Sequence, residues 1–213
     1  MEKNIDYWGK VEKAPTKAYK KYFQFEKEYL LEHVSKNSSV LDIACGDGRT
    51  IMTLLEETQN ITGIDNDAKA IQEASSRLKH EEGVLLAGAD ATDIPFEAHT
   101  FDYVTLMLSF SNFDSYKNVA LSEIERVLKP DGKLFLSCYS DTAIKDRIEM
   151  YKIIEIPIES IVGNKFIFKG SDGSIASEGF SEKEISSIVA QSNMKIIEAN
   201  RVGDLALFFS ISK

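Results

Sequence analysis

Two glycines follow closely on a short apolar run near residue 40. Residues 40–48 read Val-Leu-Asp-Ile-Ala-Cys-Gly-Asp-Gly, and Gly46 and Gly48 allow the backbone to turn sharply and approach a ligand without a Cβ clash. A helix expected over 49–57 would direct its N-terminal N–H groups at this turn, which favours an anionic group. Taken alone, a glycine pair in a turn is more often structural.

Two carboxylates follow the next two expected strands. Asp65 ends the strand expected over 60–65, and an acidic residue about 20 positions after a glycine turn can accept both hydroxyls of a ribose. Asp90 follows the strand expected over 83–88. Its carboxylate can accept a hydrogen bond from an exocyclic adenine amine, and the N–H of Ala91 can reach a ring nitrogen.

Each carboxylate also has an ordinary structural interpretation. In isolation, Asp65 would be an N-cap or Asx-turn residue and Asp90 a turn residue. Together with Asp42, however, they stand at three successive strands, and open α/β sheets bind ligands in the crevice at the carboxyl ends of such strands. The combination is therefore a stronger signal than any one member.

The rest of the chain predicts the elements that position these residues. Strands and helices alternate up to residue 140, which indicates βαβ units around a parallel sheet. The expected strands are 39–44, 60–65, 83–88, 101–108 and 133–139. The expected helices are 16–35, which carries an aromatic stripe, and 49–57, 67–79 and 116–128, the last stopped by Lys-Pro-Asp-Gly at 129–132.

A different pattern begins after residue 140. Residues 165–178 predict a β-hairpin, and Ser181 with Glu184 predicts a capping box that opens a helix to about residue 192. Strands are expected at 194–199 and 205–211, and the link between them is too short for a parallel crossover. The last strand should therefore run antiparallel.

Residues 38–140 resemble the class I S-adenosylmethionine-dependent methyltransferases of the small-molecule type. Val40 to Thr50 is similar to their motif I, and residues 125–132 to their lead into strand five. Asp65 and the Asp90-Ala91 pair match the acidic residue after strand two and the adenine-contacting pair. The resemblance implies a Rossmann-like, doubly wound, seven-stranded and mostly parallel sheet with an antiparallel last strand.

The same resemblance assigns a cofactor site for S-adenosylmethionine, with S-adenosylhomocysteine as product. Its residues would be Asp42, Ala44, Cys45, Gly46, Gly48, Asp65, Asn66, Asp90, Ala91 and Leu108. The glycine turn would line the methionine end, Asp65 and Asn66 the ribose, and Leu108 would close the site from strand four. Ala44 departs from the family, where glycine is most common, so we expect slightly altered turn geometry. Arg49 could pair with the cofactor's carboxylate, but we favour a solvated first-turn side chain.

Candidates for the methyl acceptor site are weaker. They are Tyr7, Tyr19, Tyr22, Ser109, Phe110 and Asn112. The tyrosines would either contact substrate or pack a helix onto the sheet, and Phe110 is equally a core aromatic. The Asn/Asp-Pro-Pro-aromatic and Pro-Cys signatures of amino-group and cytosine methylation are absent after strand four. No strong general base is evident, because His99 reads as a surface residue, so the catalytic residues are unassigned.

Composition narrows the classes of partner. The 213 residues carry a formal net charge of −9 with 43% hydrophobic residues, which is ordinary for one globular domain and disfavours nucleic acid. The lysine-rich stretch 10–27, interrupted by glutamates that include Glu26, reads as a solvated helix face.

No run approaches the roughly 20 apolar residues of a membrane helix, and residues 1–6 lack a secretory signal, so we expect no membrane partner and a cytoplasmic location. Neither Cys45 nor Cys138 has metal-ligand spacing, so we expect no metal.

We therefore expect a single domain that transfers a methyl group to a small molecule by in-line displacement. Its parts would be an N-terminal helical cover (1–37), a cofactor-binding core (38–140), an insert covering the substrate (141–180), and a terminal helix with a strand pair (181–213). A protein or RNA methyltransferase, a nicotinamide-dependent oxidoreductase and an inactive cofactor-binding module remain alternatives. The acceptor atom and the oligomeric state stay open.

Overall fold

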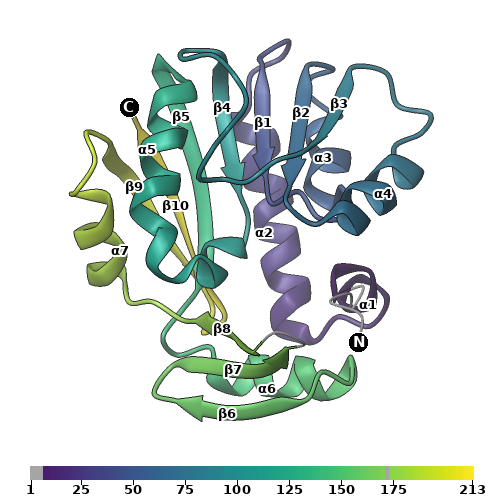
Figure 1. The fold of residues 1–213 in the computed structure, drawn as a ribbon, viewed down its shortest axis with the longest axis vertical. Coiled ribbons are helices and arrows are strands. Elements are labelled where there is room, and N and C mark those ends of the chain that lie inside the picture. The colour runs from purple at the N-terminus through teal and green to yellow at the C-terminus, as the bar shows by residue number, and fades with distance from the viewer. Residues whose placement is uncertain (1–6, 171–172) are drawn as a thin grey trace.

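A seven-stranded sheet forms the centre of the computed structural model, which describes the backbone of residues 7–170 and 173–213 and the side chains of 9–168 and 176–213 (Figure 1). The strand order is β3-β2-β1-β4-β5-β10-β9. The strands are β1 (Val40–Ile43), β2 (Ile61–Asp65), β3 (Val84–Gly88), β4 (Phe101–Leu106), β5 (Leu128–Tyr139), β9 (Lys195–Val202) and β10 (Ala206–Ser212). Strands β1 to β5 pair in parallel, and β10 runs antiparallel to both neighbours. The expected Rossmann-like fold is confirmed.

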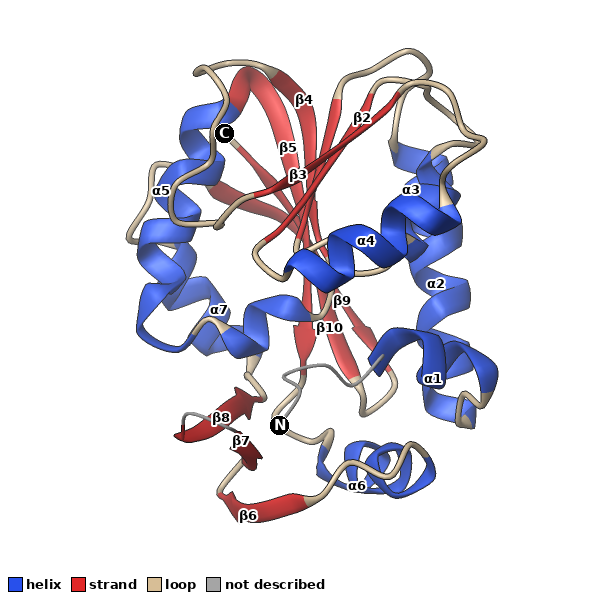
Figure 2. Cartoon of the chain, turned by 45° about the vertical axis from the view of Figure 1, so that its right-hand side comes forward, coloured by secondary structure: helices blue, strands red, loops and turns tan. Residues whose placement is uncertain are grey.

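Helices cover both faces of this sheet (Figure 2). On one face lie α2 (Lys17–His33), α3 (Arg49–Leu54) and α4 (Ala68–Arg77), and on the other lie α5 (Lys117–Val127) and α7 (Glu182–Val189). Because both faces are covered, β1 is buried throughout, as the apolar run in the sequence requires. A short helix, α1 (Tyr7–Lys13), precedes α2 and was not expected from the sequence.

The insert after β5 is larger than the expected hairpin. It contains α6 (Ile144–Ile153) and a three-stranded antiparallel sheet of β6 (Ile158–Val162), β7 (Lys165–Gly170) and β8 (Gly173–Glu178). Gly163 and Asn164 form the tight turn between β6 and β7, and Gly163 has a positive φ of 61°, as such turns require. The insert lies beyond the carboxyl ends of β4 and β5 (Figure 1).

The capping box at the start of α7 is present as expected. Ser181 Oγ accepts a hydrogen bond from the Glu184 backbone N–H, and Glu184 Oε2 accepts one from the Ser181 N–H at 2.7 Å. We expect Ser181→Ala to lower the free energy of unfolding by about 1 kcal/mol, because the α7 N-terminus loses its acceptor. Urea denaturation measures this cost. The matched control is Ser186→Ala in the exposed interior of the same helix, and an equal loss in both variants would contradict the capping role.

Candidate cofactor and substrate site

A pocket of about 260 Å³ opens at the carboxyl ends of β1, β2 and β3. Strand β1 pairs with β2 on one side and with β4 on the other. The strand order therefore reverses at β1, and ligands of α/β sheets bind in the crevice at such a point. Its lining includes five of the expected cofactor residues, which are Ala44, Asp65, Asn66, Asp90 and Ala91. Asn112 also lines it, together with Phe113 and Tyr116.

Asp65 joins the glycine turn to the end of β2. Its Oδ2 accepts a hydrogen bond from the Gly46 N–H at 3.0 Å, and its Oδ1 accepts one from the Asp67 N–H at 2.9 Å. Burial raises the pKa of Asp65 above its usual value, although both backbone N–H groups oppose that shift. Asp65 therefore forms the Asx turn that was its ordinary structural interpretation. The same residue also lines the pocket.

Asp90 is held at the rim of the pocket by its neighbours. Its Oδ1 accepts hydrogen bonds from the Thr92 N–H at 2.9 Å and the Thr92 hydroxyl at 2.7 Å, and its Oδ2 accepts one from Asn66 Nδ2 at 3.1 Å. These bonds, those of Thr92 first, lower the pKa of Asp90. The rim therefore carries an ionised acceptor of fixed orientation beside the Ala91 backbone. Sequence reasoning did not identify Thr92.

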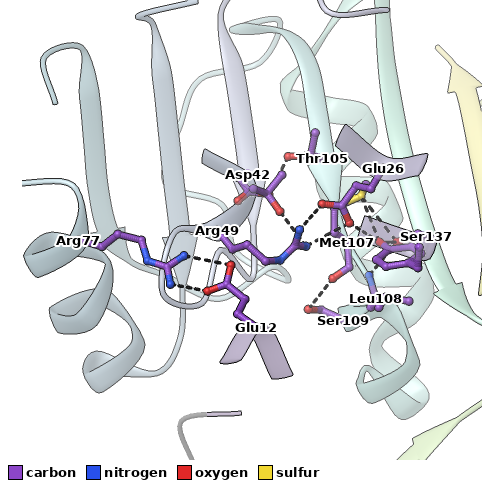
Figure 3. Close-up of polar contacts among 12 residues, drawn as sticks. Glu12, Glu26, Asp42, Arg49, Arg77, Thr105, Met107, Leu108, Ser109 and Ser137 are labelled. Atoms are coloured by element: carbon purple, nitrogen blue, oxygen red, sulfur yellow. Dashed lines mark hydrogen bonds and ion pairs between the residues drawn. The ribbon is translucent and has the colours of Figure 1, made fainter. Parts of the chain in front are cut away.

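Asp42 lies fully buried beneath the glycine turn. Its Oδ1 accepts a hydrogen bond from the Thr105 hydroxyl at 2.7 Å (Figure 3), and its Oδ2 has no hydrogen-bond partner among the described residues. Burial raises the pKa of Asp42 to about 7. The nearby Arg49 cation opposes the effect of burial on this pKa, but Oδ2 still lacks a hydrogen-bond donor among the described residues. A buried acceptor without a donor is costly, so this oxygen fits a cationic ligand group that donates a hydrogen bond. Thr105 was also missed, although it is a polar residue within an otherwise apolar run.

The glycine turn adopts left-handed backbone conformations. Ala44, Gly46 and Gly48 have φ values of 53°, 55° and 85°. Ala44 thus takes the conformation that glycine adopts more readily, and a Cβ at Gly48 would stand 2.8 Å from the Leu78 side chain. Cys45 is buried beside them, and burial raises the pKa of its thiol well above the usual value.

The expectation that Arg49 is solvated is wrong. Arg49 donates to both carboxylate oxygens of Glu26, at 2.5 and 3.1 Å (Figure 3), and the side chains are only 14% and 1% exposed. The reason is that α2 packs against α3 and turns Glu26 inward, so this glutamate does not belong to a solvated helix face. The Tyr22 hydroxyl also donates to Glu26, and it lies 2.7 Å from Ser137 Oγ.

The other substrate candidates separate into buried and pocket-lining residues. Tyr19 and Tyr22 are fully buried, and the Tyr19 hydroxyl donates to that of Tyr139 at 3.1 Å. Phe110 is buried in the core against Phe113 and Phe180.

The end of β4 supplies two more of the expected residues. Leu108 is buried with φ of 56° and donates its N–H to Ser137 Oγ at 2.9 Å. The Ser109 hydroxyl donates to the Met107 carbonyl at 3.2 Å. The side chain of Tyr7 lies outside the described residues.

The described residues hold neither a cluster of metal-ligating side chains nor a helix suited to a membrane. Residues 7–170 and 173–213 contain no group of three or more His, Cys, Asp or Glu side chains arranged to hold a metal ion. In the same part of the chain, no helix is long and apolar enough to cross a membrane.

Comparison with known proteins adds a family match. The model described as a methyltransferase domain matches residues 41–136. A demethylmenaquinone methyltransferase of Staphylococcus haemolyticus (strain JCSC1435) is 30% identical over 137 residues, which cover 63% of this chain and 57% of that protein. The chain thus spans little more than half the length of the curated relatives it matches.

Solved structures share the fold over nearly the whole chain. The PH0226 protein of Pyrococcus horikoshii OT3 superposes with a TM-score of 0.73 at 22% identity, covering 93% of this chain and 92% of that one. The 1,6-didemethyltoxoflavin-N1-methyltransferase of Burkholderia thailandensis was solved with bound 1,6-didemethyltoxoflavin and S-adenosylhomocysteine. It superposes with a TM-score of 0.70 at 17% identity, covering 98% of this chain and 84% of that one. At these identities the likeness shows the fold.

Proposed function

We propose that this chain transfers a methyl group from S-adenosylmethionine to a small-molecule acceptor, because residues 41–136 match the methyltransferase-domain model and the fold is that of solved methyltransferases. The observation that carries the proposal is the pocket at the carboxyl ends of β2 and β3, which Asp65 and Asp90 line, with the buried carboxylate of Asp42 on the neighbouring strand β1. These carboxylates match the ammonium, ribose and adenine groups of one ligand. A nicotinamide cofactor gives no role to the orphaned Asp42 oxygen.

The residues present fit this cofactor. Asp65 has lone pairs left for ribose hydroxyls beyond its two backbone bonds, and Asp90 and the Ala91 N–H offer an acceptor and a donor to adenine. The unpartnered Oδ2 of Asp42 would accept the amino group of the methionine end. When bound, the sulfonium supplies an activated methyl group, so the chain's own contribution is to hold the reactants in line and exclude water.

Three observations support a small-molecule acceptor. The net charge of −9 repels polyanions. The names of two matched proteins specify small acceptors, a demethylmenaquinone and a didemethyltoxoflavin. The insert lies over the carboxyl ends of the strands (Figure 1). In this proposal, residues 38–140 bind the cofactor while 1–37 and 141–180 cover the acceptor.

Calorimetric titration tests the cofactor assignment directly. We expect S-adenosylhomocysteine to bind with a stoichiometry of one per chain and NAD not to bind. Absence of S-adenosylhomocysteine binding overturns the proposal, and binding of NAD alone would indicate an oxidoreductase.

The affinity for S-adenosylhomocysteine should depend on pH through Asp42. Burial raises the pKa of Asp42 to about 7, against the lowering effects of Thr105 and Arg49. Below that pH the free protein holds the carboxyl protonated, and the ligand ammonium must displace this proton. We therefore expect affinity to fall by up to about tenfold per pH unit below 7 and to level off above it. Titrations across this window measure the slope.

The control for this slope is Asp42→Asn, which cannot ionise. Its affinity should be weaker than that of the wild type above pH 7 and flat across the same window. A wild-type affinity that does not change with pH, or an unchanged slope in the variant, would exclude Asp42 as the ammonium acceptor.

A further inference from the structure

A buried arginine lies between the central sheet and the insert. Arg147, on α6, is 1% exposed. Its guanidinium carbon stands 4.1 Å from the ring centroid of Tyr139, at the end of β5, and 4.1 Å from that of Phe166, on β7. Aromatic faces stabilise a cation in such a position, but they leave its N–H groups in need of acceptors.

Only part of this guanidinium is satisfied. Nε and Nη2 donate to the Tyr151 hydroxyl at 3.2 and 2.9 Å, and Nη2 also donates to the Ser177 carbonyl at 3.2 Å. Nη1 is shielded from solvent and has no hydrogen-bond partner among the described residues.

The described residues also supply no counter-charge for this cation. No aspartate or glutamate in the described part of the chain forms an ion pair with Arg147. A buried charge is ordinarily paired and hydrogen-bonded, because its desolvation is otherwise uncompensated. Arg49, whose side chain is 14% exposed, shows the ordinary arrangement with its buried partner Glu26. Arg147 is therefore a buried donor that a bound anion would satisfy.

The position of Arg147 relates this donor to methyl transfer. The buried apolar cluster that contains Tyr139, Tyr151 and Phe166 also contains Leu108, which follows β4 at the edge where the cofactor residues converge. The cluster is thus continuous from the end of β4 to the insert. The aromatic rings beside Arg147 match a flat molecule in kind, because rings prefer stacked or edge-on contacts with other rings.

We propose that Arg147 recognises the methyl acceptor, and that this acceptor is planar and carries an anionic oxygen, either a carboxylate or an ionised hydroxyl. The inference rests on the proposed methyltransferase function and names the substrate class for it. The anion would accept a hydrogen bond from Nη1 and supply the missing counter-charge. Arg147 selects and orients the acceptor in this scheme, and it takes no proton.

Matched probes test the preference in the complex with S-adenosylhomocysteine. Benzoate is compared with benzamide for the carboxylate, and para-nitrophenolate with para-nitroanisole for the ionised hydroxyl, all by calorimetry at mildly alkaline pH. We expect the anion of at least one pair to bind about ten- to a hundredfold more tightly than its neutral partner, as a charged hydrogen bond predicts. The pair that shows the preference identifies the source of the anionic oxygen. Lack of preference in both pairs overturns the inference.

Variants assign the preference to Arg147. Arg147→Gln should abolish the difference between anion and neutral probe, and Arg147→Lys, which keeps the charge, should retain part of it. The control is Arg201→Gln, which removes an exposed arginine that contacts Thr142 next to α6 and should leave the preference intact. An unchanged preference in Arg147→Gln contradicts the proposal.

The two proposals fail differently. If the wild type does not bind S-adenosylhomocysteine, the methyltransferase function is wrong. If it binds S-adenosylhomocysteine but prefers neither anion, only the role of Arg147 is wrong. Should Arg147→Gln unfold, the wild-type probe comparison and Arg147→Lys still decide the outcome.

Discussion

Asp65→Ala is expected to weaken S-adenosylhomocysteine binding by at least about a hundredfold. The carboxylate would lose two charged hydrogen bonds to the ribose hydroxyls, each of which stabilises by about 1.5–3 kcal/mol. The substitution also removes the acceptor for the Gly46 and Asp67 N–H groups. The glycine turn thereby loses this side-chain link to β2 and keeps the backbone bond from the Cys45 N–H to the Ile64 carbonyl. Calorimetric titration measures the loss of affinity.

Two further variants separate binding from folding in this experiment. Asp65→Asn retains the size of the side chain and one acceptor oxygen, so it should bind more tightly than Asp65→Ala but less tightly than the wild type. Asp131→Ala removes an exposed carboxylate near the start of β5 and should bind normally. If Asp65→Ala keeps an affinity within about threefold of the wild type while Asp131→Ala is normal, the ribose assignment is wrong.

The sheet could be predicted because its signals are local. Apolar runs alternate with helical patterns up to residue 140, and the short link before the last strand leaves only an antiparallel pairing. The insert was only partly predictable. Strand β6 is largely exposed and lacks the apolar run of a buried strand. The buried stripe of α6 contains Arg147 beside Met150 and Tyr151, and a charged residue on the stripe weakens its apolar pattern. The Gly163-Asn164 turn was the available signal for the third strand.

The site was predictable where the backbone alone brings residues together. Ala44, Asp65, Asn66, Asp90 and Ala91 line one pocket because each follows the carboxyl end of a parallel strand. Side-chain pairing across elements was not predictable in the same way. The partner of Asp42 is Thr105 on the neighbouring strand β4, and the choice of partner depends on register.

Glu26 illustrates a signal that lay in the sequence but was not used. Tyr19, Tyr22, Glu26 and Leu30 follow the three- and four-residue spacing of a helix stripe, and all four are buried. A carboxylate on the buried stripe of a helix requires a cation or several donors. Arg49 was the candidate cation in the expected cofactor site. The helix pattern therefore favours an Arg49–Glu26 ion pair over a solvated Arg49 side chain.

Glu26→Ala is accordingly expected to lower the free energy of unfolding by about 3–5 kcal/mol, as for other buried ion pairs that lose one partner. The variant leaves the Arg49 guanidinium buried without its carboxylate and deprives the Tyr22 hydroxyl of an acceptor. Burial lowers the pKa of Arg49, and Glu26 raises it to above its usual value. Because an arginine remains charged in proteins even without a carboxylate partner, Glu26→Ala leaves a positive charge that has lost this partner. Urea denaturation at neutral pH measures the loss.

The exposed pair Lys27–Glu56, whose side chains are 48% and 50% exposed, provides the matched control. Glu56→Ala should cost less than about 1 kcal/mol, because solvent screens this ion pair. The double variant Glu26→Leu with Arg49→Met should recover much of the stability lost in Glu26→Ala, since apolar side chains often replace a buried pair without cost. Equal losses in Glu26→Ala and Glu56→Ala would show that the buried pair does not stabilise the fold. Arg49 directly follows Gly48, and Glu26 fixes it to α2. If the double variant recovers stability but binds S-adenosylhomocysteine poorly, the role of the pair is to position the glycine turn.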